Sequence, residues 1–341
     1  MYRIRMTSGT GGIVNIGFTC YANSVIQAFR QYENIIELFQ EDKYTILLKN
    51  GCKYNNFTKQ FANIIQTLSK INSNSSIRPG GFWNSLDTAI RDTCFEHLRS
   101  RQPHDAHEFL MFILDAVHES LSKSVNMNIT KVILNSEKQK LQQKSLEIWK
   151  AQFEKNYSPF VNIFFGIHHI QVICKKCKNI SNNFETFNTL KGSFNNNNNN
   201  PTIIECLLND LNEEILEGYA CDTCKEKTEA TKQTRIWKLP KNLIIVLKRF
   251  TYDGRKITTP IISEPLNFET IYSTLSPYKN QTKYEIVSTV DHHGSINGGH
   301  YTAQGYNIND YKWFQYDDQN VNPLETPYIG NSTYILFLTH K

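Results

Sequence analysis

The chain has 341 residues, enough for one large domain or two ordinary ones, and its 40% hydrophobic and 20% charged residues are typical of a soluble globular protein. The net charge of +5 is spread along the chain, which argues against nucleic acid as a partner. No apolar run approaches the roughly 20 residues that span a bilayer, and the first residues lack the apolar core of a secretory signal. We therefore expect an intracellular protein, cytoplasmic or nuclear, whose eight cysteines serve metal binding or catalysis rather than disulfides.

The first part of the chain has mostly helical periodicity. Apolar residues recur at intervals of three and four between Tyr21 and about Leu121. Asp105, followed three residues later by Glu108, has the form of a helix N-cap. The predicted helices run from Cys20 to at least Phe29 and over residues 57–68, 105–120 and 138–155.

The part after Pro159 is rich in β-branched and aromatic residues, which predicts strands. The predicted strands cover residues 160–173, 243–250, 284–290, 301–306, 312–316 and 333–338. A helical half followed by a largely antiparallel β half is an α+β arrangement. The asparagine run at 195–200 has nothing to bury and is expected to form a disordered surface loop.

One short segment, residues 12–24, predicts a nucleophile. A glycine-containing turn brings Cys20 to the expected first turn of a helix, where unpaired backbone N–H groups favour a thiolate. The amide of Asn15 lies just upstream and is a candidate donor to an oxyanion. Far downstream, His300 offers a base, and Asp317 and the adjacent Asp318 offer carboxylates to orient it. The pattern predicts a cysteine hydrolase.

Two CxxC pairs, Cys174 with Cys177 and Cys221 with Cys224, predict a metal site. Four thiolates suit a closed, structural zinc ion, because no open coordination position is implied. Four unconnected thiols or a redox pair are the alternatives. The other cysteines outside the cleft, Cys52, Cys94 and Cys206, are expected to be ordinary buried residues.

The segment around Cys20 resembles the cysteine box of the ubiquitin-specific proteases, and the segment around His300 resembles their histidine box. Residues 102–110 and 247–250 are similar to two further family landmarks, and the resemblance runs from about Gly12 to about Leu338. It implies a papain-like cysteine protease fold with a helical thumb, an antiparallel β palm and zinc-bearing β fingers. The expected division is an N-terminal extension at 1–10 and a catalytic domain at 11–341. Within that domain, the thumb covers about 11–158, the fingers with part of the palm about 159–250, and the palm about 251–341.

The resemblance also implies residue roles. Cys20 is the expected nucleophile, His300 the base, Asp317 the residue that orients His300, and Asn15 the oxyanion-stabilising amide. His292 and His293 are alternative bases by chemistry alone, and Asp318 is the alternative to Asp317, since adjacent strand residues point to opposite faces.

The family hydrolyses the bond after the C-terminal glycine of ubiquitin, whose diglycine end passes through a narrow tunnel to the cysteine. Asp105, Gly299 and Tyr301 are expected to line that tunnel, and glycine at 298 and 299 lets a backbone approach closely. The expected partners are ubiquitin and ubiquitinated proteins. Because the chain carries little beyond the catalytic domain, a separate activating or targeting protein is also expected.

Two positions depart from the family pattern. Phe18 stands two residues before the cysteine, where many members carry an amide or a small residue, and His104 replaces a common glutamine beside Asp105. Phe18 motivates one rival hypothesis, a ubiquitin-binding scaffold with a dormant active site. A second rival is a protease for a ubiquitin-like modifier, and a third is a nucleic-acid-binding zinc ribbon.

Overall fold

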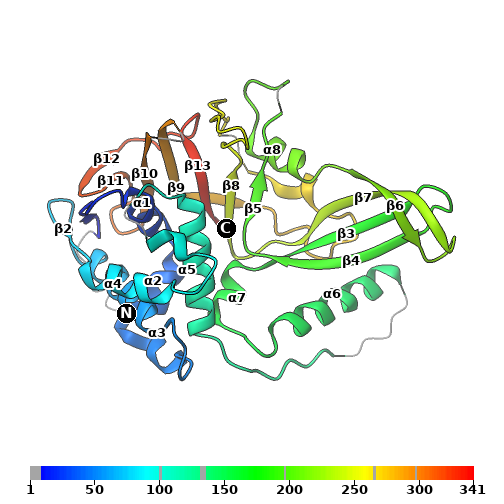
Figure 1. Cartoon of the computed structure of the whole chain (residues 1–341), viewed down its shortest axis with the longest axis horizontal. Coiled ribbons are helices and arrows are strands. Elements are labelled where there is room, and N and C mark those ends of the chain that lie inside the picture. The colour runs from blue at the N-terminus through cyan, green and yellow to red at the C-terminus, as the bar shows by residue number, and fades with distance from the viewer. Residues whose placement is uncertain (1–8, 100–101, 131–135, 196, 264–265, 296–297) are drawn as a thin grey trace.

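The computed structural model describes residues 9–99, 102–130, 136–195, 197–263, 266–295 and 298–341 (Figure 1). Helices from the first half of the chain pack against a seven-stranded sheet, and a four-stranded sheet projects away from both (Figure 1). In the part of the chain that the structure describes, none of the helices has the length and apolar character needed to cross a membrane.

The helical part surrounds a central helix. In α1 (Cys20–Phe29) every residue after Cys20 is buried, because the helix packs against α5 on one side and against β9, β10 and β11 on the other. The predicted helices of this part are confirmed. The helical elements are α1, α2 (Glu33–Phe39), η1 (Gln40–Leu47), α3 (Asn55–Leu68), α4 (Gly80–Ala89), η2 (Glu96–Arg99), α5 (Ala106–Ser120), α6 (Glu137–Phe153) and α7 (Pro159–Phe164).

The seven-stranded sheet has the strand order β12-β11-β10-β9-β13-β8-β5 and is antiparallel except for the β5–β8 pair. Its strands are β5 (Leu190–Gly192), β8 (Asn242–Leu247), β9 (Tyr284–Ser295), β10 (Gly298–Asn307), β11 (Lys312–Asp317), β12 (Asn320–Leu324) and β13 (Thr333–His340). The short helix α8 (Ile203–Asp210) packs on β5, and η3 (Phe268–Ile271) packs on α8. A two-stranded pair, β1 (Gly12–Ile13) with β2 (Ser76–Ile77), leads into α1.

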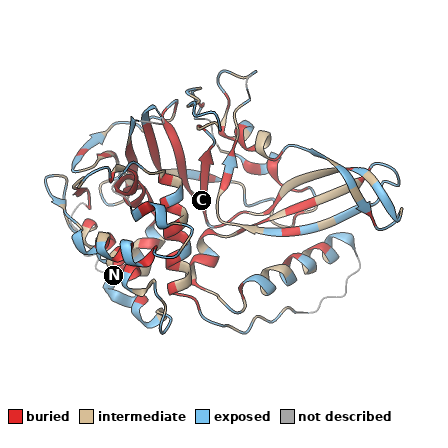
Figure 2. Cartoon of the chain, in the orientation of Figure 1, coloured by how far each residue is buried: buried red, intermediate tan, exposed pale blue. Residues whose placement is uncertain are grey.

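The four-stranded sheet has the order β4-β3-β7-β6. Its strands are β3 (Gly166–Cys174), β4 (Ile180–Phe187), β6 (Glu214–Cys221) and β7 (Glu226–Lys238). Helix α6 packs along β4, and its Ser145 hydroxyl accepts a 3.0 Å hydrogen bond from the indole of the buried Trp237. Figure 2 shows buried residues gathered where helices and the seven-stranded sheet meet, and mostly exposed residues at the outer end of the four-stranded sheet.

The predicted strand at 160–173 is wrong in its first part. Pro159 begins α7, and the strand β3 starts only at Gly166. Proline at the first helical position lacks an N–H that the helix does not use there, and its backbone angle suits a helix. Phe160 and Phe164 lie on one face of this turn and are buried, with Phe164 stacked 5.2 Å from Phe29. Packing against α1 therefore outweighs the β propensity of the segment.

The expected burial of the other cysteines needs correction at two positions. Cys206 is buried as expected, whereas Cys52 is half-buried and Cys94 is exposed. In the asparagine run, residues 195 and 197–200 form a mostly exposed turn, and residue 196 lies outside the described residues. Residues 1–8 of the expected N-terminal extension also lie outside them.

Candidate active site

Cys20 is the first residue of α1, as the sequence predicts. Burial raises the pKa of its thiol; hydrogen bonds from the backbone N–H groups of Tyr301 and Tyr21 lower that pKa, and the nearby Asp318 carboxylate raises it. The backbone N–H groups at the helix start lower the pKa as expected, but burial outweighs them and the net shift is upward. Withdrawal from water costs the anion more than the backbone N–H groups return.

His300 and Asp317 meet across neighbouring strands. The Nε2 atom of His300, on β10, lies 2.6 Å from Oδ1 of Asp317, the last residue of β11. This contact orients the imidazole and makes Nδ1 the nitrogen that could exchange a proton with a substrate or thiol. Of the two alternative bases, His293 instead contacts Thr302, and the pKa of His292 is lowered to about 4, mainly by burial.

Asp318 has a role that the sequence did not predict. Its Oδ2 accepts a 2.9 Å hydrogen bond from the Asn15 amide, and its Oδ1 accepts a 2.7 Å bond from the Asn23 amide. The side-chain oxygen of Asn15, Oδ1, accepts hydrogen bonds from the backbone N–H groups of Gly17 and Thr19, at 3.0 and 3.2 Å. The Asn15 side chain is therefore held at both ends. The available sequence signal was Asn23, three residues after Cys20 and so on nearly the same helix face.

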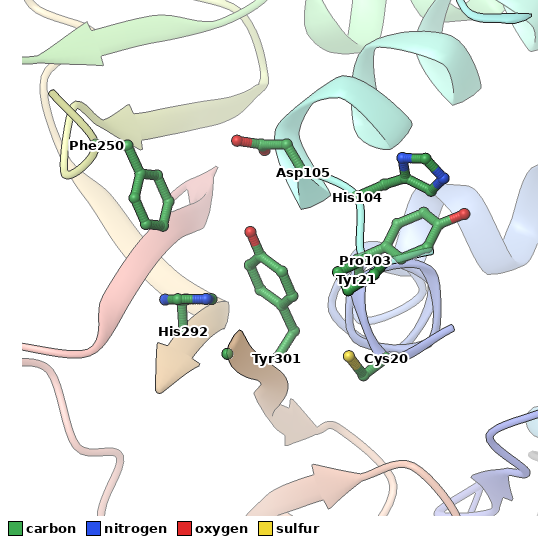
Figure 3. Close-up of a pocket in the computed structure, with 9 residues that line it drawn as sticks. Cys20, Tyr21, Pro103, His104, Asp105, Phe250, His292 and Tyr301 are labelled. Atoms are coloured by element: carbon green, nitrogen blue, oxygen red, sulfur yellow. The ribbon is translucent and has the colours of Figure 1, made fainter. Parts of the chain in front are cut away.

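A cavity of about 180 Å³ extends from Cys20 between the helices and the sheet (Figure 3). Tyr301 points into it with its hydroxyl toward Asp105, while Phe250 and His292 lie on the side opposite Tyr21 and His104 (Figure 3). The structure therefore brings all three predicted tunnel residues to one cavity that Cys20 also lines. Its lining is Cys20, Tyr21, Pro103, His104, Asp105, Phe250, His292, Gly299 and Tyr301.

Asp105 is the N-cap of α5, as predicted, and accepts a 2.6 Å hydrogen bond from the backbone N–H of His107. The hydroxyl of Tyr334, on β13, lies 2.9 Å from each of its carboxylate oxygens. Burial raises the pKa of Asp105, and the hydrogen bond from Tyr334 opposes that rise. Asp105 thus presents a desolvated carboxylate to the cavity with a fixed orientation.

Glycine at 299 is required for a different reason from the expected one. A Cβ there would lie 2.0 Å from Nε2 of His292 and 2.8 Å from the His293 carbonyl oxygen, whereas a Cβ at Gly298 would meet nothing within 4 Å. The His292 ring packs 4.6 Å from the Tyr301 ring and 5.1 Å from Phe250. The missing side chain at 299 therefore makes room for an aromatic cluster that shapes the cavity wall.

The two departures from the family pattern occupy different environments. Phe18 is 58% exposed and adopts a left-handed backbone conformation with φ 55°. His104 lines the cavity and packs edge-on against Tyr21, with 5.4 Å between ring centroids. The histidine at 104 therefore contributes an aromatic wall to the cavity.

The two CxxC pairs come together at the outer end of the four-stranded sheet. Their sulfur atoms lie within 4.8 Å of one another, with 3.9 Å from Cys174 to Cys224 and 3.6 Å from Cys177 to Cys221. A tetrahedral ion with metal–sulfur bonds of about 2.3 Å requires sulfurs about 3.8 Å apart, so the residues fit such an ion. Backbone N–H donation from Cys177, with the Thr228 hydroxyl, lowers the pKa of Cys174 to about 6. The four cysteines are placed to hold one metal ion.

Comparison with known proteins supports this description. The family model for ubiquitin carboxyl-terminal hydrolase matches residues 11–338. Ubiquitin carboxyl-terminal hydrolase 5 of Saccharomyces cerevisiae is 25% identical, over 96% of this chain and 44% of its own length. Ubiquitin carboxyl-terminal hydrolase 2 of Gallus gallus is 27% identical, over 98% of this chain and 94% of its own. The chain therefore spans less than half the length of the yeast relative.

Solved structures share the fold. A chain of the SAGA Ubp8/Sgf11/Sus1/Sgf73 DUB module bound to ubiquitin aldehyde superposes with a TM-score of 0.73 and 23% identity, covering 99% of this chain and 71% of that one. The same module bound to monoubiquitin gives a TM-score of 0.73 with 24% identity. The α+β fold with thumb, palm and fingers is thereby confirmed. Because the family model covers nearly the whole sequence, the chain belongs to the ubiquitin carboxyl-terminal hydrolase family, among the ubiquitin-specific proteases.

Proposed function

We propose that this chain is a thiol-dependent deubiquitinase that hydrolyses the bond after the C-terminal glycine of ubiquitin. The observation that carries the proposal is the 2.6 Å contact between His300 and Asp317, next to the helix that begins with Cys20, in a chain that matches the family over residues 11–338. Cys20 is the nucleophile, His300 the general base and then acid, and Asp317 orients the imidazole.

Burial raises the pKa of the Cys20 thiol, so the mechanism assigns formation of the thiolate to a base. Nδ1 of His300 accepts the thiol proton as sulfur attacks the glycine carbonyl, and the resulting imidazolium is stabilised by Asp317. The imidazolium then protonates the leaving amine, and water hydrolyses the thioester. Asn15 donates one amide hydrogen to Asp318 and has a second for the oxyanion. One such donor lowers the barrier by about 3 kcal/mol.

The cavity beside Cys20 is the proposed channel for the ubiquitin tail. Glycines carry no side chains, and the aromatic walls formed by Tyr301, His292 and Phe250 leave room for little more than backbone. Asp105, with its desolvated carboxylate, is placed to bind backbone N–H groups or a cationic side chain of the tail. The structural neighbours bound to ubiquitin aldehyde and to monoubiquitin support ubiquitin as the ligand.

We also propose that the metal is zinc, held by the thiolates of Cys174, Cys177, Cys221 and Cys224. Zinc would supply structural cross-linking there rather than chemistry, because all four positions are taken by protein sulfur. The proposed division is a thumb at about 11–158, fingers with part of the palm at about 159–250, and a palm at about 251–341. The SAGA module combines Ubp8 with Sgf11, Sus1 and Sgf73, which supports a targeting or activating protein partner here as well. The proposed location is intracellular, cytoplasmic or nuclear.

The test is hydrolysis of a ubiquitin C-terminal fluorogenic amide by the wild type and by Cys20→Ala. Turnover is expected in the wild type and should fall by about a thousandfold or more in the variant, since the nucleophile is lost. The exposed Cys94→Ala is the matched control and should keep wild-type activity. No turnover by a folded wild type that still binds ubiquitin would instead favour the dormant scaffold. A higher kcat/KM for a ubiquitin-like modifier than for ubiquitin would favour the rival hypothesis of a protease for that modifier.

A further inference from the structure

The turn that precedes Cys20 holds a large apolar side chain in an unfavourable backbone conformation. Phe18 has φ 55° and follows Gly17 at φ 108°. Residues other than glycine and asparagine rarely adopt the left-handed region, and such conformations concentrate at functional sites. The Phe18 side chain is 58% exposed, so burial in the core does not compensate for the conformation.

Hydrogen bonds on both sides of Phe18 impose this conformation. The carbonyl oxygen of the Asn15 side chain accepts from the N–H of Gly17 at 3.0 Å and from the N–H of Thr19 at 3.2 Å. The chain therefore wraps around the Asn15 carboxamide, and the Phe18 ring, on the outside of this wrap, faces solvent. The ring therefore projects from a hydrogen-bonded turn, two residues before Cys20, the proposed nucleophile.

Two regions of the cleft adjoin Cys20: the cavity proposed for the ubiquitin tail, and the region that holds His300 and Asp317. The cavity proposed for the ubiquitin tail is lined by helix α1, the start of α5 and strands of the sheet, and none of residues 15–18 lies in its wall. The turn is instead tied by Asn15 to Asp318, whose carboxylate lies within 4.8 Å of the ring of His300 and the carboxylate of Asp317. His300 must protonate the leaving amine, so the leaving group departs on its side of the sulfur. The turn that carries Phe18 is therefore tied to the part of the cleft that holds His300 and Asp317.

We propose that Phe18 determines leaving-group specificity, favouring substrates in which the amine is a lysine side chain over those with a minimal amine. The aromatic ring packs on the methylene stem of the lysine, which a small leaving group lacks. In the step concerned, the bond from the glycine carbonyl carbon to the lysine Nζ breaks and the carbon–sulfur bond to Cys20 remains. The proton from the His300 imidazolium goes to Nζ. This inference rests on the proposed function.

The experiment compares two substrates that share ubiquitin and an amide bond. One carries a methylamide at the C-terminal glycine, and the other an isopeptide bond to the lysine of a short peptide; product is measured by mass spectrometry. Phe18→Asn keeps a residue that tolerates the left-handed conformation, and Phe18→Tyr keeps the ring. Tyr311→Asn is the matched control, because Tyr311 is also exposed and left-handed, with φ 54°, but lies at the far end of the β10–β11 hairpin.

Phe18→Asn is expected to lower kcat/KM for the isopeptide about fivefold to tenfold and for the methylamide less than about twofold, the scale of losing contact with one or two methylene groups. Phe18→Tyr and Tyr311→Asn should keep the wild-type ratio between the substrates. Equal effects of Phe18→Asn on both substrates would overturn the inference while leaving the hydrolase intact. A folded wild type that cleaves neither substrate would overturn the proposed function itself.

Discussion

Two adjacent carboxylates have separate tasks in the cleft. Asp317 contacts the imidazole of His300, whereas Asp318 holds the amides of Asn15 and Asn23. Consecutive residues on a strand point to opposite faces, which on its own would direct one carboxylate away from the site. Asp318 lies just beyond the strand with φ 51°, and this left-handed turn brings both carboxylates to the same side. The left-handed conformation of Asp318 is unfavourable for folding, but it places both carboxylates in the proposed site.

Tyr334 provides a prediction at the same scale, because its hydroxyl donates to both oxygens of Asp105. A hydrogen bond to a carboxylate stabilises the charged form, so Tyr334→Phe should raise the pKa of Asp105 further above its usual value. The carboxylate then gains a proton at higher pH as the solution is acidified. We expect KM for a ubiquitin substrate to rise by about tenfold in mildly acidic buffer, with the rise starting at higher pH than in the wild type.

The measurement is the pH dependence of KM and kcat for both proteins, with Tyr311→Phe as a control for loss of an exposed hydroxyl. A purely structural role for Tyr334 would shift stability without moving the KM profile. Superimposable KM profiles would therefore contradict the prediction.

At the scale of elements, the β9–β10 hairpin provides both a residue of the cavity wall, Tyr301, and the proposed base, His300. In the β9–β10 pair, Tyr301 lies opposite His292 and His300 lies opposite His293. Because side chains alternate along a strand, Tyr301 faces the cavity while the neighbouring His300 faces Asp317. A slip of one residue in this register would exchange the two, so the strand pairing itself specifies that His300, the proposed base, faces Asp317.

Gly299→Ala tests this hairpin. The added methyl would lie 2.0 Å from His292, so either the ring or the strand end must move. We expect a loss of about 1–3 kcal/mol in the free energy of unfolding, together with reduced turnover of the ubiquitin amide. Gly298→Ala is the matched control, because its Cβ meets nothing within 4 Å and its stability should stay within about 0.5 kcal/mol of the wild type. Denaturant unfolding of the wild type and the two variants measures their stability, and an assay with the ubiquitin amide measures turnover. Equal stability of the two variants would refute the explanation.

Over the whole molecule, the parts differ in how they are stabilised. The largest core joins the helices to the inner face of the seven-stranded sheet, from Ile13 to Phe337. The four-stranded sheet has a small core of its own around Trp237, and its strand β6 is mostly exposed. A sheet with so little buried apolar surface would gain order from a cross-link at its outer end. A metal ion held by the four cysteines, as proposed above, would supply that cross-link at the outer end of the sheet, where most residues are exposed (Figure 2).

Metal removal should therefore affect the four-stranded sheet and leave the cleft unchanged. After chelation, or in Cys221→Ser, we expect the outer four-stranded sheet to lose protection from hydrogen exchange while the cleft stays folded. Hydrolysis of a fluorogenic amide of a short peptide that ends in two glycines should stay within about twofold. KM for ubiquitin should rise about tenfold or more, because we expect the body of ubiquitin, unlike the peptide, to contact the projecting sheet. Adding zinc back should restore KM, and the exposed Cys94→Ser serves as the control. An equal loss on peptide and ubiquitin would contradict this separation.

The sequence by itself was enough to predict the residues of the proposed chemistry. Cys20 at a helix start, His300 and Asp317, and the paired cysteines could be identified because each depends on local spacing and residue type, as do the amphipathic helices. Tertiary structure alone decided the role of Asp318, the reason for glycine at 299, the helix at Pro159 and the raised pKa of the Cys20 thiol. Each of these depends on burial, a backbone angle or a side chain distant in sequence, and local patterns do not record which segments pack together.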